Sequence, residues 1–312
     1  MTASRQFRVA ARLGLATTVL MFGLMVIGSI VRTTGSGLAC PDWPLCHGQW
    51  IPPLEPKVLI EWTHRLVALV VSLLLAAAAA WSLARPVVRA RLGALAVLGV
   101  VLLAVQILLG ALTVWKLLDP GIVGGHLGVA LLLFCTLLTF TLIARAEAGA
   151  ADRAADVTAR PAGLLPTIGL TTVVAFGQCI LGGMVAANHA GLVCRDWPTC
   201  DGQWWPPMSG LIGLHMLHRL GAYTFAVLVV VSAIRARRAP DPGIRLGAAL
   251  VLGLTLAQIV LGVANLYMGT PPWLVAFHLA TAIAILAILV TVTFRLASLA
   301  STESRLVAGE AR

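Results

Sequence analysis

The chain has 312 residues, of which 59% are hydrophobic and only 11% charged, and its formal net charge is +10. Its mean hydropathy of +0.95 lies well outside the range of a soluble globular domain. The composition therefore excludes a soluble protein with an apolar core and predicts an integral membrane protein. A membrane β-barrel is excluded as well, because the apolar segments are continuous instead of alternating.

Eight segments are long enough to span a bilayer, since a spanning helix needs roughly 20 mostly apolar residues. In chain order they are residues 13–31, 62–84, 92–115, 122–144, 164–187, 212–234, 246–268 and 273–294. The first segment is followed by further spans and by no clear small-residue cleavage site. We therefore expect a retained helix and not a removable signal peptide.

Basic residues are distributed unequally between the two sides of these spans. The side with both termini holds 16 of the 22: Arg5, Arg8, Arg12, Arg85, Arg89, Arg91, Arg145, Arg153, Arg160, Arg235, Arg237, Arg238, Arg245, Arg295, Arg305 and Arg312. The other side holds six basic and six acidic residues. The positive-inside rule predicts that both termini lie in the cytoplasm. The net charge is thus a topology signal, and we expect no nucleic-acid binding.

One sequence pattern is present twice, 154 residues apart. Residues 37–53 read GLACPDWPLCHGQWIPP and residues 191–207 read GLVCRDWPTCDGQWWPP. An ungapped alignment of residues 28–66 with residues 182–220 gives 17 identities in 39 positions. Such a duplication predicts two similar half-structures.

The duplication divides the chain into an N-terminal half, residues 1–150, and a C-terminal half, residues 151–312. Residues 145–163 have mixed charges, alanine, glycine and Pro161, and are predicted to form a cytoplasmic linker. The predicted fold class is an all-α integral membrane protein whose eight transmembrane helices form two pseudo-symmetric four-helix bundles.

Two of the extracytoplasmic loops each contain two cysteines separated by five residues, Cys40 with Cys46 and Cys194 with Cys200. The compartment permits disulfides, and a five-residue insert with a proline turn can bring two cysteines within bonding distance. Structural disulfides, a redox-active pair and a metal site all remain open, although the spacing is not one usual for zinc.

Four of the seven histidines occupy corresponding positions in the repeat, His64 with His218 and His126 with His278. At about 1.5 Å of rise per residue they lie at similar depths, near the outer membrane face. Imidazole in a bilayer is costly unless it is paired or liganded. Two facing histidines with apolar surroundings suit axial ligation of haem iron, so two metal or haem sites are predicted.

Arg65 and Arg219 directly follow two of these histidines. Each could pair with haem propionates at the outer surface or extend to lipid phosphate, and the sequence leaves both open. Six glycines could let a flat macrocycle approach the backbone. They are Gly110, Gly124, Gly125, Gly128, Gly262 and Gly269.

The two halves differ in one chemically meaningful position. Glu61 precedes His64 by three residues, whereas its counterpart in the second half is His215. Residues three apart share a helical face, so the carboxylate lies beside whatever His64 binds. Glu61 could accept a proton during oxidation of a methyl group, or form an ion pair with Arg65 at the rim.

Together these features resemble the haem A synthase family, which includes the bacterial CtaA and mitochondrial Cox15 proteins. The resemblance rests on the duplication, eight spans, paired-cysteine loops, the motif Glu61-x-x-His64-Arg65 and the four placed histidines, and it covers roughly residues 10–300. It implies a membrane oxidoreductase that converts haem O to haem A. The ring methyl at carbon 8 would become a formyl group by successive hydroxylation, supplying aa3-type oxidases.

The resemblance also implies a division of labour between the halves. The N-terminal half would hold the substrate haem O, and the C-terminal half a haem B cofactor. The implied residues are His64, His126 and Arg65 for haem O, His218, His278 and Arg219 for haem B, Glu61 for catalysis, and Cys40 with Cys46 as the functional loop pair. The implied partners are membrane lipid, haem O synthase (a protohaem farnesyltransferase) and cytochrome oxidase assembly factors; a homo-oligomer is compatible with the sequence.

Two other functions remain open from the sequence. A di-haem electron-transfer protein similar to cytochrome b would have two permanent haems in symmetrical halves. A membrane thiol–disulfide oxidoreductase would use the loop cysteines with a quinone, but it gives no role to four placed histidines.

Overall fold

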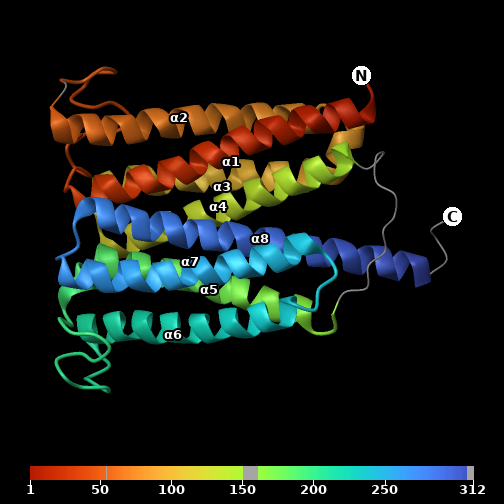
Figure 1. Ribbon diagram of the computed structural model, residues 1–312. Helices are drawn as coiled ribbons and strands as arrows, with labels where there is room; N and C mark the ends of the chain where they lie inside the picture. Colours follow the sequence, from red (N-terminus) through yellow and green to blue (C-terminus); the bar gives the residue numbers. More distant parts are fainter. Residues whose placement is uncertain (54, 150–160, 308–312) are drawn as a thin grey trace.

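The computed structural model describes residues 1–53, 55–149 and 161–307 of the chain. Long helices run side by side along one axis (Figure 1). The helices are α1 (Ala3–Thr33), α2 (Pro56–Leu83), α3 (Pro86–Trp115), α4 (Pro120–Ala148), α5 (Leu164–Ala187), the short 3-10 helix η2 (Ala190–Leu192), α6 (Gly210–Ala236), α7 (Pro242–Tyr267) and α8 (Pro272–Val307). The cysteine-containing loops lie at one end of the bundle, which we call the loop end, and α1 begins and α8 ends at the other (Figure 1).

The described residues confirm the expected fold class. Eight of their helices are long and apolar enough to cross a membrane, and no strand is present in this part of the chain apart from two isolated bridges. The chain is therefore an all-α, multi-pass membrane protein. The expected span 164–187 coincides with α5, while α1 starts ten residues earlier than expected and α8 ends thirteen residues later.

Most helices start before the apolar run by which the sequence predicted them. The start of α2 is Pro56 instead of residue 62, and the start of α3 is Pro86 instead of residue 92. Proline at the first position has a φ angle already suited to a helix and lacks an N–H that would have no partner there. At α4 the carboxylate of Asp119 also accepts the backbone N–H groups of residues 121 and 122 at 2.9 and 3.1 Å. Helix starts are thus set by caps and prolines, which a hydropathy pattern does not register.

Each half forms a closed bundle of four helices. In the first half α1 contacts α2 and α4, and α3 contacts α2 and α4; the second half repeats this pattern with α5, α6, α7 and α8. The halves meet through α1, α4, α5 and α8, where α1 packs on α8 as α5 packs on α4. These reciprocal contacts agree with pseudo-twofold symmetry. Of the expected linker 145–163, residues 145–148 belong to α4, and residues 150–160 lie outside the described part.

The two halves approach closely where α4 crosses α5. A Cβ atom on Gly124 would overlap the side chain of Met184, and one on Gly183 would overlap Leu127. Small residues at such crossings let helix backbones approach, and in a membrane this packing replaces the hydrophobic effect as a source of association. Gly124, which the sequence analysis assigned to a macrocycle, is therefore part of the contact between the halves.

Gly124 and its neighbour Gly125 allow a matched test of that contact. We expect Gly124→Leu to destabilise the purified protein by about 1–3 kcal/mol, because overpacking forces side chains and backbone apart. Gly125 is exposed and nothing lies within 4 Å of a Cβ built on it, so Gly125→Leu should change little. Thermal unfolding in detergent measures both variants, and equal midpoints would contradict the assigned contact.

Candidate haem-binding site

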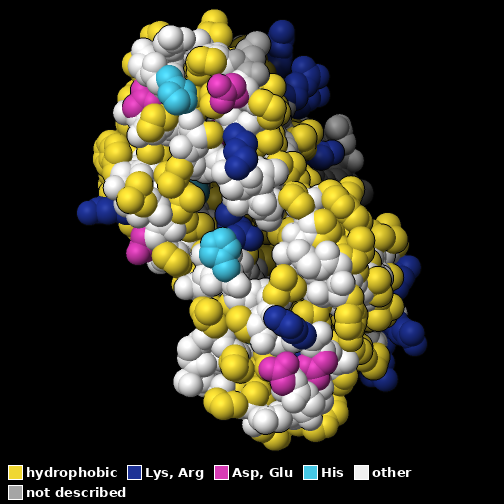
Figure 2. All heavy atoms as spheres, turned by 90° about the vertical axis from the view of Figure 1, so that its left-hand side faces the viewer, with side chains coloured by type: hydrophobic (Ala, Val, Ile, Leu, Met, Phe, Trp, Pro, Cys, Tyr) yellow, Lys and Arg dark blue, Asp and Glu magenta, His cyan; other side chains and the backbone are white. Residues whose placement is uncertain are grey.

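A cavity of about 1100 Å³ extends between the two halves and is lined by residues from both. Viewed from the loop end, the molecule is hollowed between its halves, with histidine and basic side chains around the hollow (Figure 2). Single-ligand pockets usually measure roughly 300–1,000 Å³, so the cavity has room for more than one ligand of ordinary size. All four repeat-related histidines line it.

The four histidines enter the cavity from α2, α4, α6 and α8. His64 lies eight residues after the start of α2 and His218 eight after the start of α6, whereas His126 and His278 lie six residues after their helix starts. Within each half the two imidazoles are near enough to interact electrostatically. The structure thus places all four repeat-related histidines on one cavity, with His64 near His126 and His218 near His278.

Each of these imidazoles packs the edge of its ring against a glycine on the preceding helix. A Cβ atom on that glycine would lie only 2.9–3.4 Å from the ring Cε1 atom. The pairs are Gly28 with His64, Gly110 with His126, Gly182 with His218, and Gly262 with His278. A Cβ atom would crowd the ring most at Gly182 and least at Gly110, so the glycines let each ring lie close to the neighbouring helix. The sequence suggests Gly110 and Gly262 as contacts of a macrocycle, and it contains no signal that selects Gly28 and Gly182.

The ring nitrogens are compatible with a ligand that is not protein. The Nδ1 atoms of His64, His126 and His278 are buried and have no hydrogen-bond partner among the described residues. Buried polar atoms normally have partners, and an unpaired one is unfavourable. Two imidazoles in each half, held against glycine and facing an apolar cavity, therefore fit axial ligation of haem iron.

Two of the four histidines have a glutamine beside them. The Nε2 atom of Gln106 lies 3.3 Å from the Nε2 atom of His126, whereas Gln178 makes two contacts with His218. The side-chain amide of Gln178 on α5 lies 3.0 Å from the Nδ1 atom of His218 and donates to the backbone carbonyl oxygen of His218 at 2.8 Å. Leu24 occupies the equivalent position of the first half, and its side chain has no hydrogen-bonding group. His218 thus has a side-chain restraint that its counterpart His64 lacks.

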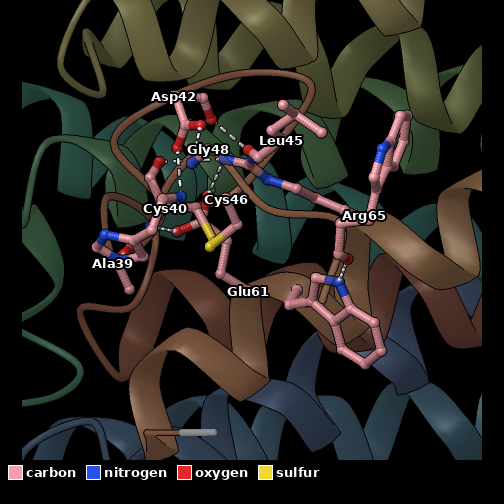
Figure 3. Close-up of a disulfide and its surroundings, with 11 residues drawn as sticks. Ala39, Cys40, Asp42, Leu45, Cys46, Gly48, Glu61 and Arg65 are labelled. Atoms are coloured by element: carbon pink, nitrogen blue, oxygen red, sulfur yellow. Dashed lines mark hydrogen bonds and ion pairs between the residues drawn. A yellow bond between two sulfur atoms is a disulfide. The ribbon is translucent and has the colours of Figure 1, made fainter. Parts of the chain in front are cut away.

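Glu61 lies at the loop end of α2, and only 4% of it is exposed. Its carboxylate accepts the backbone N–H of Cys40 at 2.8 Å and pairs with Arg65 at 2.5 Å (Figure 3). The Arg65 guanidinium also donates to the carbonyl oxygens of Cys40, Asp42 and Leu45 at 3.1, 2.7 and 2.6 Å. The ion pair considered from the sequence is therefore present. The attachment of Arg65 to the loop could not be read from residue spacing.

The second half keeps the arginine contacts and loses the carboxylate. Arg219 donates to the carbonyl oxygens of Thr199 at 2.5 Å and Cys194 at 3.2 Å. His215, which replaces the glutamate, donates from Nδ1 to the carbonyl oxygen of Ala190 at 2.7 Å. The arginine contact with the loop is thus shared by both halves, and the buried acid is specific to the first.

The loop cysteines form two disulfides, Cys40–Cys46 and Cys194–Cys200, with Sγ–Sγ distances of 1.96 and 2.02 Å. Each loop also has one antiparallel bridge at the equivalent position, from residue 46 to 49 and from 200 to 203. Among the described residues no group of His, Cys, Asp and Glu could hold a metal ion by itself. Of the three interpretations of these cysteines, the structure thus favours disulfides over a metal site.

An aspartate closes the turn in each loop. The Asp42 carboxylate accepts the backbone N–H groups of residues 48 and 47 at 2.8 and 2.7 Å, and the hydrogen bond from Gly48 holds the pKa of Asp42 below its ordinary value. Hydrogen bonds from the Thr199 hydroxyl and the Gly202 N–H lower the pKa of Asp196 to about 2. Both carboxylates therefore stay ionised at neutral pH, as acceptors for these turns.

Several bacterial proteins named Heme A synthase are similar to this chain. That of Symbiobacterium thermophilum is 33% identical over 256 residues, which cover 80% of this chain and 82% of the relative. The relative from Methylobacterium radiotolerans is 32% identical, covering 86% of this chain and 84% of its own. The relative from Methylorubrum extorquens is also 32% identical, with 89% and 84% covered.

A family model described as COX15-CtaA, cytochrome oxidase assembly protein, matches residues 11–290. The match includes all eight membrane-spanning helices in whole or large part, both disulfide loops and the four histidines of the cavity. The chain therefore belongs to the COX15-CtaA family of cytochrome oxidase assembly proteins.

Proposed function

We propose that the chain is a haem A synthase, an oxidoreductase that converts haem O to haem A for aa3-type terminal oxidases. The observation that carries this proposal is the arrangement of the cavity: two repeat-related pairs of histidines line it, and a buried glutamate lies beside only one pair. The activity named for the relatives supports the same conclusion. An enzyme that alters one haem and keeps another needs two similar sites with different chemistry.

In this proposal the two halves have different ligands. His64 and His126 hold the substrate haem O in the N-terminal half, residues 1–150. His218 and His278 ligate a haem B cofactor in the C-terminal half, residues 151–312. When bound, haem B would supply one-electron redox chemistry. Gln178 contacts His218 at two points, 3.0 and 2.8 Å away, whereas Gln106 contacts His126 at one point, 3.3 Å away, and the firmer restraint suits a permanently held cofactor.

Glu61 is the proposed catalytic base. It lies on the same face of α2 as His64, and its two oxygen atoms each accept one hydrogen bond, from Cys40 and Arg65. A carboxylate has about four lone-pair positions, so Glu61 retains capacity to accept a proton released as the methyl group is oxidised. Arg65 and Arg219 would support the propionate side of the two sites while they hold the loops.

The alternatives explain less of the geometry. A di-haem electron carrier would use the same four histidines, but it gives no reason for a buried acid in one half only. A thiol–disulfide oxidoreductase would use the loop cysteines and leaves the four histidines without a role. The family and the named relatives favour neither.

We further propose that the loop end faces outward from a bacterial cytoplasmic membrane, with both termini in the cytoplasm. The arginine-rich helix ends lie opposite the disulfide loops, as the positive-inside rule requires. Haem O synthase, the protohaem farnesyltransferase, would deliver the substrate, and cytochrome oxidase assembly factors would receive the product. A homo-oligomer is compatible with this arrangement.

Replacing single histidines should separate the two haem sites. His218→Ala or His278→Ala should lose a tightly held haem B, because each removes an axial ligand. His64→Ala or His126→Ala should abolish conversion while the haem B spectrum persists. Optical spectra and mass identification of extracted haems measure both effects. Four variants that all keep the spectrum and haem A formation would show that the ligands are assigned wrongly.

Glu61→Gln should keep the shape of the side chain and remove the base. We expect a folded protein that carries haem B and accumulates haem O or a partly oxidised alcohol, with conversion slowed about 10²–10⁴-fold. His215→Gln is the matched control at the equivalent position and should be far milder. Wild-type rates in Glu61→Gln, or equal losses in both variants, would leave the ion pair with Arg65 as the only role of Glu61.

Membrane orientation can be measured independently of activity. Cysteine-reactive or epitope labels near residues 48 and 202 should be reachable from outside intact cells. Reporter fusions after residue 155 and at the C-terminus should report the cytoplasm. If the fusion after residue 155 reports the outside, the proposed orientation is wrong.

A further inference from the structure

Arg32 lies on the cavity at the boundary between the two halves. It is in the last turn of α1, is partly buried and lines the cavity. Its guanidinium donates to the carbonyl oxygen of Ala186 on α5 at 2.5 Å. Ala186 follows Arg32 by the 154 residues of the repeat, so the contact joins equivalent positions across the pseudo-twofold axis. Only one of these two positions carries a charge.

Most hydrogen-bonding capacity of Arg32 is unused by the protein. A guanidinium has five N–H donors, and the described residues accept from Arg32 only through Ala186. None of the described carboxylates lies within ion-pair distance of it. By contrast, Arg65 makes three hydrogen bonds to loop carbonyls and one ion pair. Arg32 therefore lines the cavity as a cation whose remaining N–H groups can donate to a ligand.

A partly buried cation without a carboxylate partner needs a physical reason. Burying an ionised group without a partner is strongly unfavourable, and arginine within a membrane-spanning helix usually marks a functional contact. Arginine also recognises carboxylates well, because two parallel N–H groups match the two oxygens. An anionic carboxylate entering the cavity would satisfy both the charge and the donors.

The position of Arg32 along α1 relates it to the first pair of histidines. Gly28, which packs against the His64 ring, precedes Arg32 by four residues and so shares its helical face. One helical turn, about 6 Å, separates the two positions along the axis, with Arg32 nearer the loop end. In the second half Gly182 packs against His218, and Ala186 lies one turn further on. Substituents at the rim of a macrocycle held by His64 would thus lie near the guanidinium.

We propose that Arg32 binds a propionate carboxylate of the tetrapyrrole held in the N-terminal half. The inference rests on the proposed function, because it takes the ligand to be a haem. It goes further by assigning the anion contact to a residue outside both histidine motifs. Because alanine stands at the equivalent position, the contact distinguishes the substrate half from the cofactor half.

The charge of the ligand can be varied separately from its shape. Iron protoporphyrin IX and its dimethyl ester have the same macrocycle, but the ester has no ionised carboxylates. Titration of both into the detergent-purified full chain, followed by the Soret band, gives a ratio of dissociation constants for each variant. Loss of folded protein affects both titrations equally, so the ratio reports the carboxylate contact.

Arg32→Gln should lower the preference for the free acid by roughly tenfold or more, since hydrogen bonds to charged groups are worth that much in affinity. Arg32→Lys should retain part of the preference, because it keeps the charge. Lys116→Gln is the control: Lys116 is an exposed cation at the loop end that does not line the cavity, and its ratio should equal that of the wild type. The same loss should occur with Arg32→Gln in a His218→Ala background, where the N-terminal half is measured alone.

An unchanged ratio in Arg32→Gln would overturn the proposal, as would an equal loss in Lys116→Gln. A loss that disappears in the His218→Ala background would assign the contact to the wrong half and overturn it too. If the wild type binds neither compound, the proposed function fails and the Arg32 contact with it. If both compounds bind and Arg32→Gln leaves the ratio of their dissociation constants unchanged, only the proposed Arg32 contact is wrong.

Discussion

The contact between each histidine and a glycine on the preceding helix is the constraint on which the arrangement of the site depends. An imidazole in an apolar membrane interior must be oriented by its neighbours, and here the absence of a Cβ atom allows the ring to lie against the helix backbone. The contact requires that consecutive helices be adjacent and in a defined register. Helices α1 with α2, α3 with α4, α5 with α6 and α7 with α8 meet this requirement. The smallest repeated unit of the protein is therefore a pair of consecutive helices in which a glycine of the first packs against a histidine of the second. Each half contains two such pairs.

On this repeated frame the halves differ at a few equivalent positions beside the cavity. Three of the differing pairs, first half before second, are Leu24 and Gln178, Arg32 and Ala186, and Glu61 and His215. Two of the three replace a charge of the first half by a neutral side chain in the second, and the third adds a hydrogen bond to a histidine there. Charged groups can move protons and recognise ionised substrates, whereas neutral hydrogen bonds restrain a ligand. The differences thus agree with oxidation of the substrate in the first half and retention of a bound cofactor in the second.

Part of this could be predicted from the sequence, and the remainder depends on which helices become neighbours. Continuous apolar runs predicted the eight spans, and the repeat predicted that His64 and His126 correspond to His218 and His278. The glycine partners could not be identified, because glycine is common in membrane helices and only the register between helices selects four of them. Arg32 was counted from the sequence only as one of six cations on the outer side. Its place on the axis between the halves follows from the packing of α1 against the second half.

The disulfide loops connect this frame to the proposed chemistry. In both halves an arginine of the helix that carries a cavity histidine donates to the carbonyl of the first loop cysteine, so each loop is attached to that helix. Only in the first half does the same cysteine also donate its backbone N–H to a carboxylate. The loop of the first half therefore restrains the side chain proposed as the base, whereas in the second half His215 turns to Ala190 instead. Because the arginine contact is common to both loops, the two loops differ in proposed chemistry through the side chain that lies three residues before the histidine.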